Sequence, residues 1–143
     1  MEKKLNQLLA SYQVHYQNLR SLHWNIKGSN FFELHLKYEE LYTRTQDIID
    51  ELAERILALG FQPLSQFRTY LEHSVIPENK IIEDGKEGMT YLVQAQEALL
   101  KLEQNLLQES GEADDEGTNS LMSDLIREKD KTSWMFRAWL GRS

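Results

Sequence analysis

The stretch from His23 to Glu54 decides how this chain folds: His23-Trp24-Asn25-Ile26-Lys27-Gly28, then Phe31-Phe32-Glu33-Leu34-His35, then Glu39, and finally Asp50-Glu51-Leu52-Ala53-Glu54. Apolar residues recur at helical spacing on both sides of Gly28, which predicts one helix ending near Lys27 and a second from about Asn30 to Leu59. Gly28 is then the hinge of a helical hairpin. Antiparallel helices on its two sides should bring the imidazoles of His23 and His35 level with each other. That is an arrangement of metal ligands.

Carboxylates share a face of the second predicted helix with His35. Glu39 lies four residues after His35, and Glu54 lies four residues after Asp50, so each pair stacks on one face. At about 100° per residue, the four positions fall within a stripe roughly 100° wide. His35 and Asp50 are nevertheless fifteen residues apart, which is about 22 Å of helix, whereas the ligands of one ion lie only about 2 Å from it. One chain therefore cannot supply all of these ligands to the same ion.

Two copies of the chain can supply these ligands to one metal site. If the second helix packs antiparallel against its own copy about a two-fold axis, His35 of one chain lies beside Asp50 and Glu54 of the other. The axis then crosses the helix midway between the ligands, near Arg44 and Thr45. Because a two-fold interface is isologous, such a dimer contains two identical sites.

Composition places the protein among single all-α domains. The chain has 143 residues, enough for one domain over 1–143 that buries roughly two-thirds of its unfolded surface. It is 41% hydrophobic with only two prolines and seven glycines, and its best-patterned segments are rich in Leu, Glu, Gln, Lys and Ala. There is no cysteine, so histidine and carboxylate are the available metal ligands. Such ligands suit iron or manganese, with zinc also possible.

Charge and hydropathy indicate which compartment and which binding partners to expect. No run approaches the roughly 18 apolar residues of a membrane span, and the start Met-Glu-Lys-Lys-Leu-Asn has no secretory apolar region, so we expect a cytoplasmic protein. The net charge of −7 disfavours binding to phosphate backbones, and Lys3-Lys4 is the only adjacent basic pair. DNA binding is therefore not expected.

The remaining periodicity predicts a bundle of four long helices with a short extra helix in the crossover between the second and the third. Gly85 and Gly88 should weaken the start of the third long helix. Trp24 is expected to pack, and His15 to lie at the surface or at the edge of the core. The predicted helices cover about 3–27, 30–59, 64–72 (after Pro63), 77 or 78 to 109, and 118–140.

The order of these motifs resembles the miniferritins of the Dps family (DNA-binding protein from starved cells). The resemblance is carried by His23-Trp24-Asn25, Gly28, Leu34-His35 and Asp50-x-x-x-Glu54-Arg55, and it extends to 115–119 (Asp-Glu-Gly-Thr-Asn) and 134–136 (Trp-Met-Phe). It implies a ferritin-like four-helix bundle and a hollow homo-oligomer, in this family a dodecamer. It also implies a ferroxidase site with two histidines from one subunit and an aspartate and a glutamate from its two-fold mate. Such a protein oxidises Fe²⁺ with hydrogen peroxide, or more slowly with dioxygen, stores the ferric mineral and protects against oxidative stress.

The resemblance bears in a particular way on Glu39, Trp24 and Ser120. Glu39 stands where the family usually has an aspartate, and its longer side chain could reach a second iron or orient His35. Trp24 would be an oxidisable ring beside the iron that takes up stray oxidising equivalents. Ser120 stands where an aspartate commonly lines a three-fold pore, although Asp124 follows one turn later.

Two other functions remain open at this stage. One is a DNA-compacting nucleoid protein, since some relatives bind DNA through lysine-rich tails, which this sequence does not show at either end. The other is a bundle protein that binds zinc or manganese, or an assembly without ferroxidase activity. The Glu-x-x-His motifs of the usual ferritin di-iron site are absent from the sequence, so an iron site should not lie inside the bundle.

Overall fold

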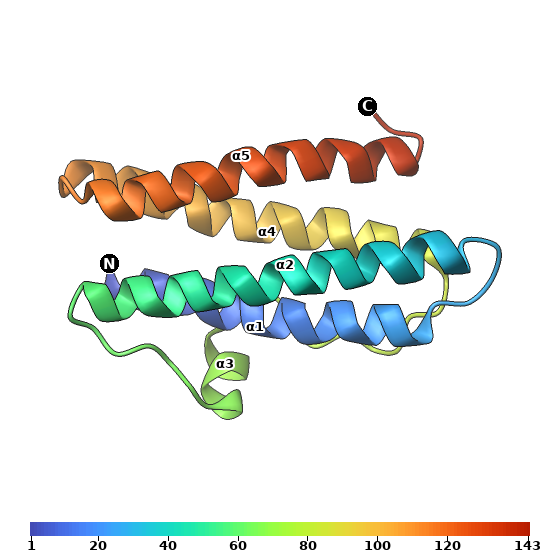
Figure 1. Cartoon of the computed structure of the whole chain (residues 1–143), viewed down its shortest axis with the longest axis horizontal. Helices are drawn as coiled ribbons and strands as arrows, with labels where there is room; N and C mark the ends of the chain where they lie inside the picture. Colours follow the sequence, from blue (N-terminus) through green and yellow to red (C-terminus); the bar gives the residue numbers. More distant parts are fainter.

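The chain forms four long antiparallel helices and one short helix, as Figure 1 shows. A computed structural model describes all residues, 1–143. The predicted four-helix bundle with a short helix in its crossover is confirmed, and no strand is present. None of the helices has the length and hydropathy that crossing a membrane requires. The helices are α1 (Glu2–Asn25), α2 (Phe31–Ala58), α3 (Phe67–His73), α4 (Gly85–Glu112) and α5 (Glu116–Trp139).

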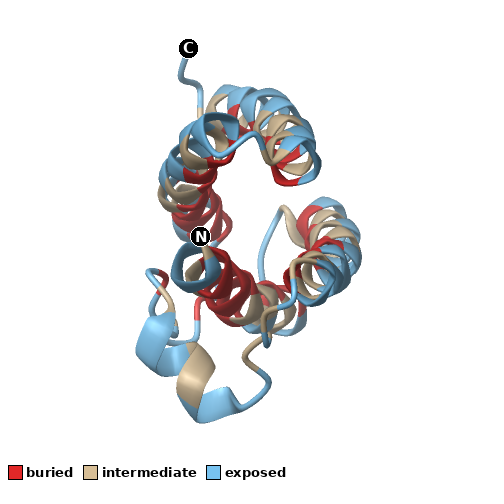
Figure 2. Cartoon of the chain, turned by 90° about the vertical axis from the view of Figure 1, so that its left-hand side faces the viewer, coloured by how far each residue is buried: buried red, intermediate tan, exposed pale blue.

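Helix α1 joins several other helices of the bundle. It packs against α2, α3 and α4, while α5 packs against α4. In the end-on view of Figure 2, buried residues line the inner faces of the long helices, whereas α3 lies outside them and contains no buried residue. The core comes from apolar residues at helical spacing. Its largest fully buried side chains are Tyr12, Tyr38, Leu5, Leu8, Leu9, Leu19, Leu52, Ile56, Leu92, Leu99, Leu106 and Met122.

The turn between α1 and α2 depends on Gly28. Its φ of 101° lies in the left-handed region, where a residue with a Cβ is strained. The Phe31 amide then donates to the Gly28 carbonyl and starts α2. The turn therefore reverses the chain within a few residues and brings the end of α1 beside the start of α2.

The long crossover is held by polar side chains of α1. Asn6 donates to the Gln62 carbonyl (3.1 Å) and accepts from the Leu64 amide (2.9 Å). Asn18 donates to the Pro77 carbonyl and accepts from the Asn79 amide, both at 3.0 Å. These bonds satisfy backbone groups that a helix would otherwise pair internally.

The predicted start of the third long helix at residue 77 or 78 is therefore wrong. Asn18 binds the backbone at Pro77 and Asn79, and α4 begins only at Gly85, where Asp84 accepts a capping hydrogen bond from the Glu87 amide (2.9 Å). The short helix begins at Phe67 rather than at residue 64.

Gly85 and Gly88 leave room on α4 for side chains of α2. A Cβ at Gly85 would lie 3.0 Å from the Leu34 side chain, and a Cβ at Gly88 would meet the Tyr38 hydroxyl. These side-chain contacts explain the two glycines at the start of a helix, where glycine has a low propensity.

His15 is buried, with 5% exposure, so the expectation of a surface or edge histidine is wrong. Its Nδ1 lies 2.8 Å from the Tyr91 hydroxyl, which also accepts a hydrogen bond from Asn18 (2.9 Å). Burial, with a smaller contribution from Lys129, lowers the pKa of His15 from 6.5 to about 3. The folded chain therefore keeps this ring neutral.

This buried ring predicts a loss of stability in acid. Because the folded pKa of His15 lies below the unfolded value, only the unfolded chain takes up this proton as the pH falls from about 6.5 towards 3, which lowers the free energy of unfolding by about 1.4 kcal/mol per pH unit. A His15→Gln variant lacks this contribution and should show a shallower pH dependence. Urea unfolding of both proteins at pH 6.5 and 4.5, at one protein concentration, measures it. Equal losses in the two proteins would contradict the assignment.

Candidate metal centre

His23 and His35 form an interlocked pair at the α1–α2 hairpin. Their rings stack with centroids 3.8 Å apart and planes 11° apart, so the two imidazoles are level, as the hairpin predicts. Nδ1 of His23 lies 2.6 Å from the His35 carbonyl oxygen, and Nδ1 of His35 lies 2.7 Å from the His23 carbonyl oxygen. Each histidine therefore holds the backbone of the other.

These reciprocal bonds prepare both rings to bind a metal. A carbonyl oxygen only accepts hydrogen bonds, so Nδ1 carries the hydrogen in His23 and in His35. In a neutral ring, Nε2 then keeps its lone pair, which is the form that ligates metals. A hydrogen bond from the other ring nitrogen is the usual way in which a ligating histidine is oriented.

Aromatic side chains enclose this pair. The Phe31 ring stacks on His35 with centroids 4.9 Å apart and planes 16° apart, and the Tyr42 ring meets His23 edge-on at 5.4 Å. His23 is consequently buried, with only 8% of its side chain exposed. No motif in the sequence pointed to Tyr42.

Glu39 is the one carboxylate that reaches the histidine pair within the chain. Its Oε1 lies 3.7 Å from Nε2 of His23, and its side chain is 52% exposed. This placement fits either direct ligation or a role in orienting an ion beside His23. No group of three or more His, Cys, Asp or Glu side chains that could hold a metal forms in the chain.

Asp50 and Glu54 lie far from the histidines. Helix α2 runs without a break from Phe31 to Ala58, so Asp50 is about 22 Å along the helix from His35. Both carboxylates are exposed on the surface of α2. The chain thus presents a pair of imidazoles at one end of α2 and a pair of carboxylates towards the other.

Trp24 does not pack against the core of the chain. Its side chain is 58% exposed, and the Arg20 guanidinium lies over its ring at 4.9 Å. The expectation of a packing residue is therefore wrong for the isolated subunit. The ring remains open to solvent or to a neighbouring subunit next to His23.

Asp115 makes the polar contacts between α4 and α5 in the acidic segment that joins them. Helix α4 continues to Glu112, and Asp115 caps α5 by accepting from the Thr118 amide at 3.1 Å. Arg55 donates to the same carboxylate (2.6 Å), and these contacts hold the pKa of Asp115 below its usual value against the effect of burial, the largest single influence. Asp115 is thus engaged within the subunit, while Ser120 is exposed. The pore position of Ser120 stays a prediction.

Comparisons with known proteins agree with this architecture. The sequence matches the ferritin-like domain family over residues 2–143. It is 37% identical over 138 residues to DNA protection during starvation protein 2 of Bacillus anthracis, covering 96% of this chain and 94% of that protein. The crystal structure of the Dps protein of Vibrio cholerae O1, described as a member of a broad superfamily of ferritin-like diiron-carboxylate proteins, has a TM-score of 0.96 at 50% identity and covers 97% of this chain and 87% of that one. Dps of Staphylococcus aureus has a TM-score of 0.94 at 36% identity, with coverage of 97% and 93%.

The aromatic enclosure predicts an effect of Tyr42 on metal binding. A Tyr42→Ala variant removes the ring that supports His23 and should weaken Co²⁺ binding by about tenfold or more, as loss of a supporting contact around a metal site does. Tyr42→Phe keeps the ring and should bind Co²⁺ like the unaltered protein. Titration of the assembled proteins by visible absorption measures both affinities. Unchanged affinity in the alanine variant would show that the ring does not support the ligand.

Proposed function

Because this chain belongs to the Dps family of ferritin-like proteins, we propose that it oxidises Fe²⁺ at sites shared between two subunits and stores the ferric product in a hollow homo-oligomer, as expected a dodecamer. One observation carries the proposal. The chain holds two imidazoles with free Nε2 atoms, whereas the carboxylates that would complete the site lie about 22 Å away on the same helix. A second copy is required to bring them together.

The exposed face of α2 supports an antiparallel pairing. Phe32 is 86% exposed near the start of α2, and Leu57 is 54% exposed near its end. These two apolar residues are equally far from the point between Arg44 and Thr45, as are His35 and Glu54. One two-fold axis at that point therefore places Phe32 against Leu57 of the partner subunit and His35 against Glu54 of the partner subunit.

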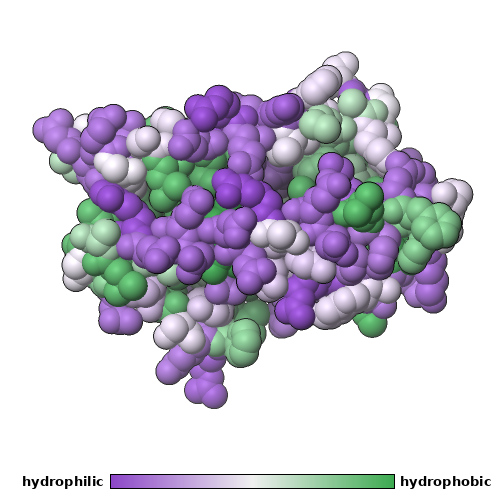
Figure 3. Space-filling model, viewed as in Figure 1, coloured by the Kyte–Doolittle hydropathy of each residue, from purple (hydrophilic) through white to green (hydrophobic).

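The surface view agrees with this pairing. Figure 3 shows apolar side chains towards both ends of the face that α2 and α5 form, with mostly hydrophilic side chains between them. Burial of exposed aromatic and aliphatic side chains is the main contribution to a stable subunit interface. We expect α3 to cover part of the same interface, since Phe67 is 85% and Leu71 is 48% exposed.

Each residue has a defined part in the proposed reaction. His23 and His35 bind Fe²⁺ through Nε2, and Asp50 and Glu54 of the partner subunit add negative charge that favours Fe³⁺. Two Fe²⁺ ions each give one electron to hydrogen peroxide, which takes up two protons and leaves as two water molecules. Dioxygen is the slower oxidant. Glu39 holds or orients an iron beside His23.

The exposed ring of Trp24 takes up stray oxidising equivalents in this proposal. Consumption of Fe²⁺ together with peroxide prevents hydroxyl-radical formation and gives protection against oxidative stress. We place this activity in the cytoplasm.

DNA compaction is the second function to consider, since several relatives are named for DNA protection during starvation. The net charge here is −7. Many of the cations are already neutralised by ion pairs within the chain, such as Lys4 with Glu109, Lys27 with Glu83 and Arg127 with Asp124. We therefore predict no mobility shift of duplex DNA at physiological salt without added divalent metal. Tight binding that weakens steeply with salt would favour DNA compaction.

A third possibility is a zinc- or manganese-binding bundle, or an assembly without catalysis. Anaerobic titration with Fe²⁺, followed by peroxide, separates it from the proposed ferroxidase. Rapid formation of ferric product supports the ferroxidase, and binding of metal without oxidation supports the third possibility.

Mixed assemblies test the shared site directly. His23→Ala and Asp50→Ala should each abolish most rapid peroxide-dependent oxidation of Fe²⁺, because each removes part of the same composite site. When the two variants are dissociated and reassembled together, a mixed two-fold dimer has one site with both defects and one site with neither. Stopped-flow measurement should therefore show a fraction of activity that neither parent has.

The control is reassembly of each variant alone, with the oligomer mass measured by light scattering. If the mixture reassembles to the full mass but its activity stays at the level of the parents, the shared-site proposal is wrong. The histidines and carboxylates would then act within one chain or at separate metals.

A further inference from the structure

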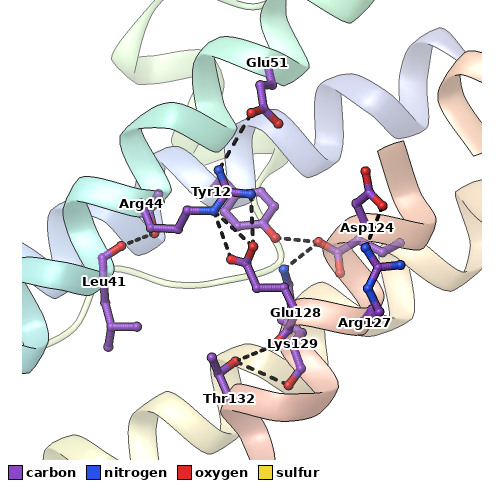
Figure 4. Close-up of polar contacts among 11 residues, drawn as sticks. Tyr12, Leu41, Arg44, Glu51, Asp124, Arg127, Glu128, Lys129 and Thr132 are labelled. Atoms are coloured by element: carbon purple, nitrogen blue, oxygen red, sulfur yellow. Dashed lines mark hydrogen bonds and ion pairs between the residues drawn. The ribbon is translucent and has the colours of Figure 1, made fainter. Parts of the chain in front are cut away.

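The interior of the bundle contains a charged cluster that the proposed shared site does not use. Lys129 of α5 is 3% exposed, and its Nζ lies 2.9 Å from Oε2 of Glu103 on α4, which is 0% exposed. The Tyr12 hydroxyl of α1 donates to the same oxygen at 2.5 Å. The ammonium also lies over the Tyr12 ring, 4.9 Å from its centroid. Figure 4 shows Tyr12 and Lys129 converging from different helices.

One carboxylate oxygen of this cluster lacks a partner. Oε1 of Glu103 is buried and has no hydrogen-bond partner. A small cavity of about 40 Å³ adjoins the cluster, lined in part by Tyr12, Gln96 and Lys129. Arg44 of α2 binds both carboxylate oxygens of Glu128 of α5 at the wall of this cavity, at 3.1 and 3.0 Å. Helices α1, α4 and α5 thus contribute the buried residues of this cluster, and the half-exposed Arg44–Glu128 pair joins α2 to its outer side.

Ferritin-like bundles that hold a di-iron site build it at this kind of position, from glutamates and histidines that project inward from facing helices. The residues here do not fit such a pair of metals. Glu103 is the only carboxylate that is fully enclosed, and the group beside it is an ammonium, which donates hydrogen bonds and cannot ligate a metal. The relative from Vibrio cholerae is described as belonging to a diiron-carboxylate superfamily, yet this interior contains a lysine–glutamate pair.

We propose that the Lys129 ammonium occupies an internal carboxylate site in place of a metal ion and so excludes divalent cations from the bundle. A buried carboxylate requires a cation partner, because an unpaired charge in the interior is strongly destabilising. The lysine arm supplies that cation covalently, whatever the metal concentration. The consequence that iron binds only at the shared histidine sites rests on the proposed function, but the exclusion itself does not.

The electrostatics of Glu103 agree with this role. Burial raises the pKa of Glu103, and Lys129 is the strongest influence that opposes the rise. Without the ammonium, the centre keeps the Glu103 carboxyl group with its unpartnered oxygen and the Tyr12 phenol beside the vacated space, where a divalent cation can replace the carboxyl proton. Oxygen donors of this kind favour Mg²⁺, Mn²⁺ and Fe²⁺.

Removal of the lysine therefore creates a measurable metal site. All variants carry His23→Ala and His35→Ala, so that the shared sites are absent, and Mn²⁺ is the probe, counted by electron paramagnetic resonance on the assembled protein. Lys129→Ala should bind one more Mn²⁺ per chain than the background. Lys129→Arg keeps a cation and should bind no additional Mn²⁺. Glu103→Gln added to Lys129→Ala should abolish the gain.

Thermal unfolding with and without Mn²⁺ covers the case of a poorly folded variant. If Lys129→Ala loses helicity without metal, Mn²⁺ should restore the circular dichroism spectrum, and it should not stabilise the Lys129→Arg variant. A folded Lys129→Ala protein that binds no additional Mn²⁺ would overturn the proposal and leave Lys129 as a structural ion pair only. Loss of helicity that Mn²⁺ does not repair would overturn it equally.

Discussion

The length of uninterrupted helix between His35 and Asp50 is the constraint on which the proposed metal site depends. Fifteen residues of α-helix hold the two groups about 22 Å apart. Only unfolding of α2 would change that distance. The histidine pair is rigid as well, because each ring is bonded to the backbone of the other. Both halves of the proposed site are thus complete within the subunit, and only their meeting depends on a second copy. The proposed site therefore predicts that metal binding and assembly are linked, because an ion bound between subunits would stabilise the interface that completes its site.

The interior of the bundle is the second place where a ferritin-like protein can hold iron. In this chain it is filled by Tyr12, Glu103 and Lys129, and the Arg44–Glu128 pair closes the same region between α2 and α5. A buried ion pair of this kind adds little net stability, since desolvation offsets most of the attraction between the charges. Its main effect, in our proposal, is to keep divalent cations out of the space between the helices. In the account proposed here, two features of the fold would confine iron to the subunit interface: ligands on the surfaces of α1 and α2, and a lysine in the core.

Periodicity and motif spacing predicted the fold well where neighbouring residues alone determine the structure. The hinge at Gly28, both helices of the first hairpin and the level placement of His23 and His35 followed from the sequence because helix geometry converts spacing into position. The late start of α4 could not be predicted in this way. It depends on Asn18, which binds backbone groups about sixty residues away, and a tertiary contact of that kind leaves no periodic signal.

Burial was the least predictable property. His15 lies at the edge of an apolar stripe in the sequence but is buried beside the Tyr91 hydroxyl, whereas Trp24 is open to solvent in the single subunit. Lys129 gave no signal at all, since a lysine on an amphipathic helix is ordinarily a surface residue. For the candidate site, spacing alone predicted that the ligands come from two chains, and this stays a prediction. Tyr42 and Phe31 around the histidines became apparent only in three dimensions.

Anomalous X-ray scattering from crystals of the assembled protein, grown anaerobically with Co²⁺ as a stand-in for Fe²⁺, tests the shared site most directly. We predict a peak about 2 Å from Nε2 of His23 and of His35, completed by the carboxylates of Asp50 and Glu54 of the partner subunit. The account is contradicted if the metal at the histidines is held by residues of one chain alone, or if the peaks lie elsewhere while His23 and His35 remain without metal.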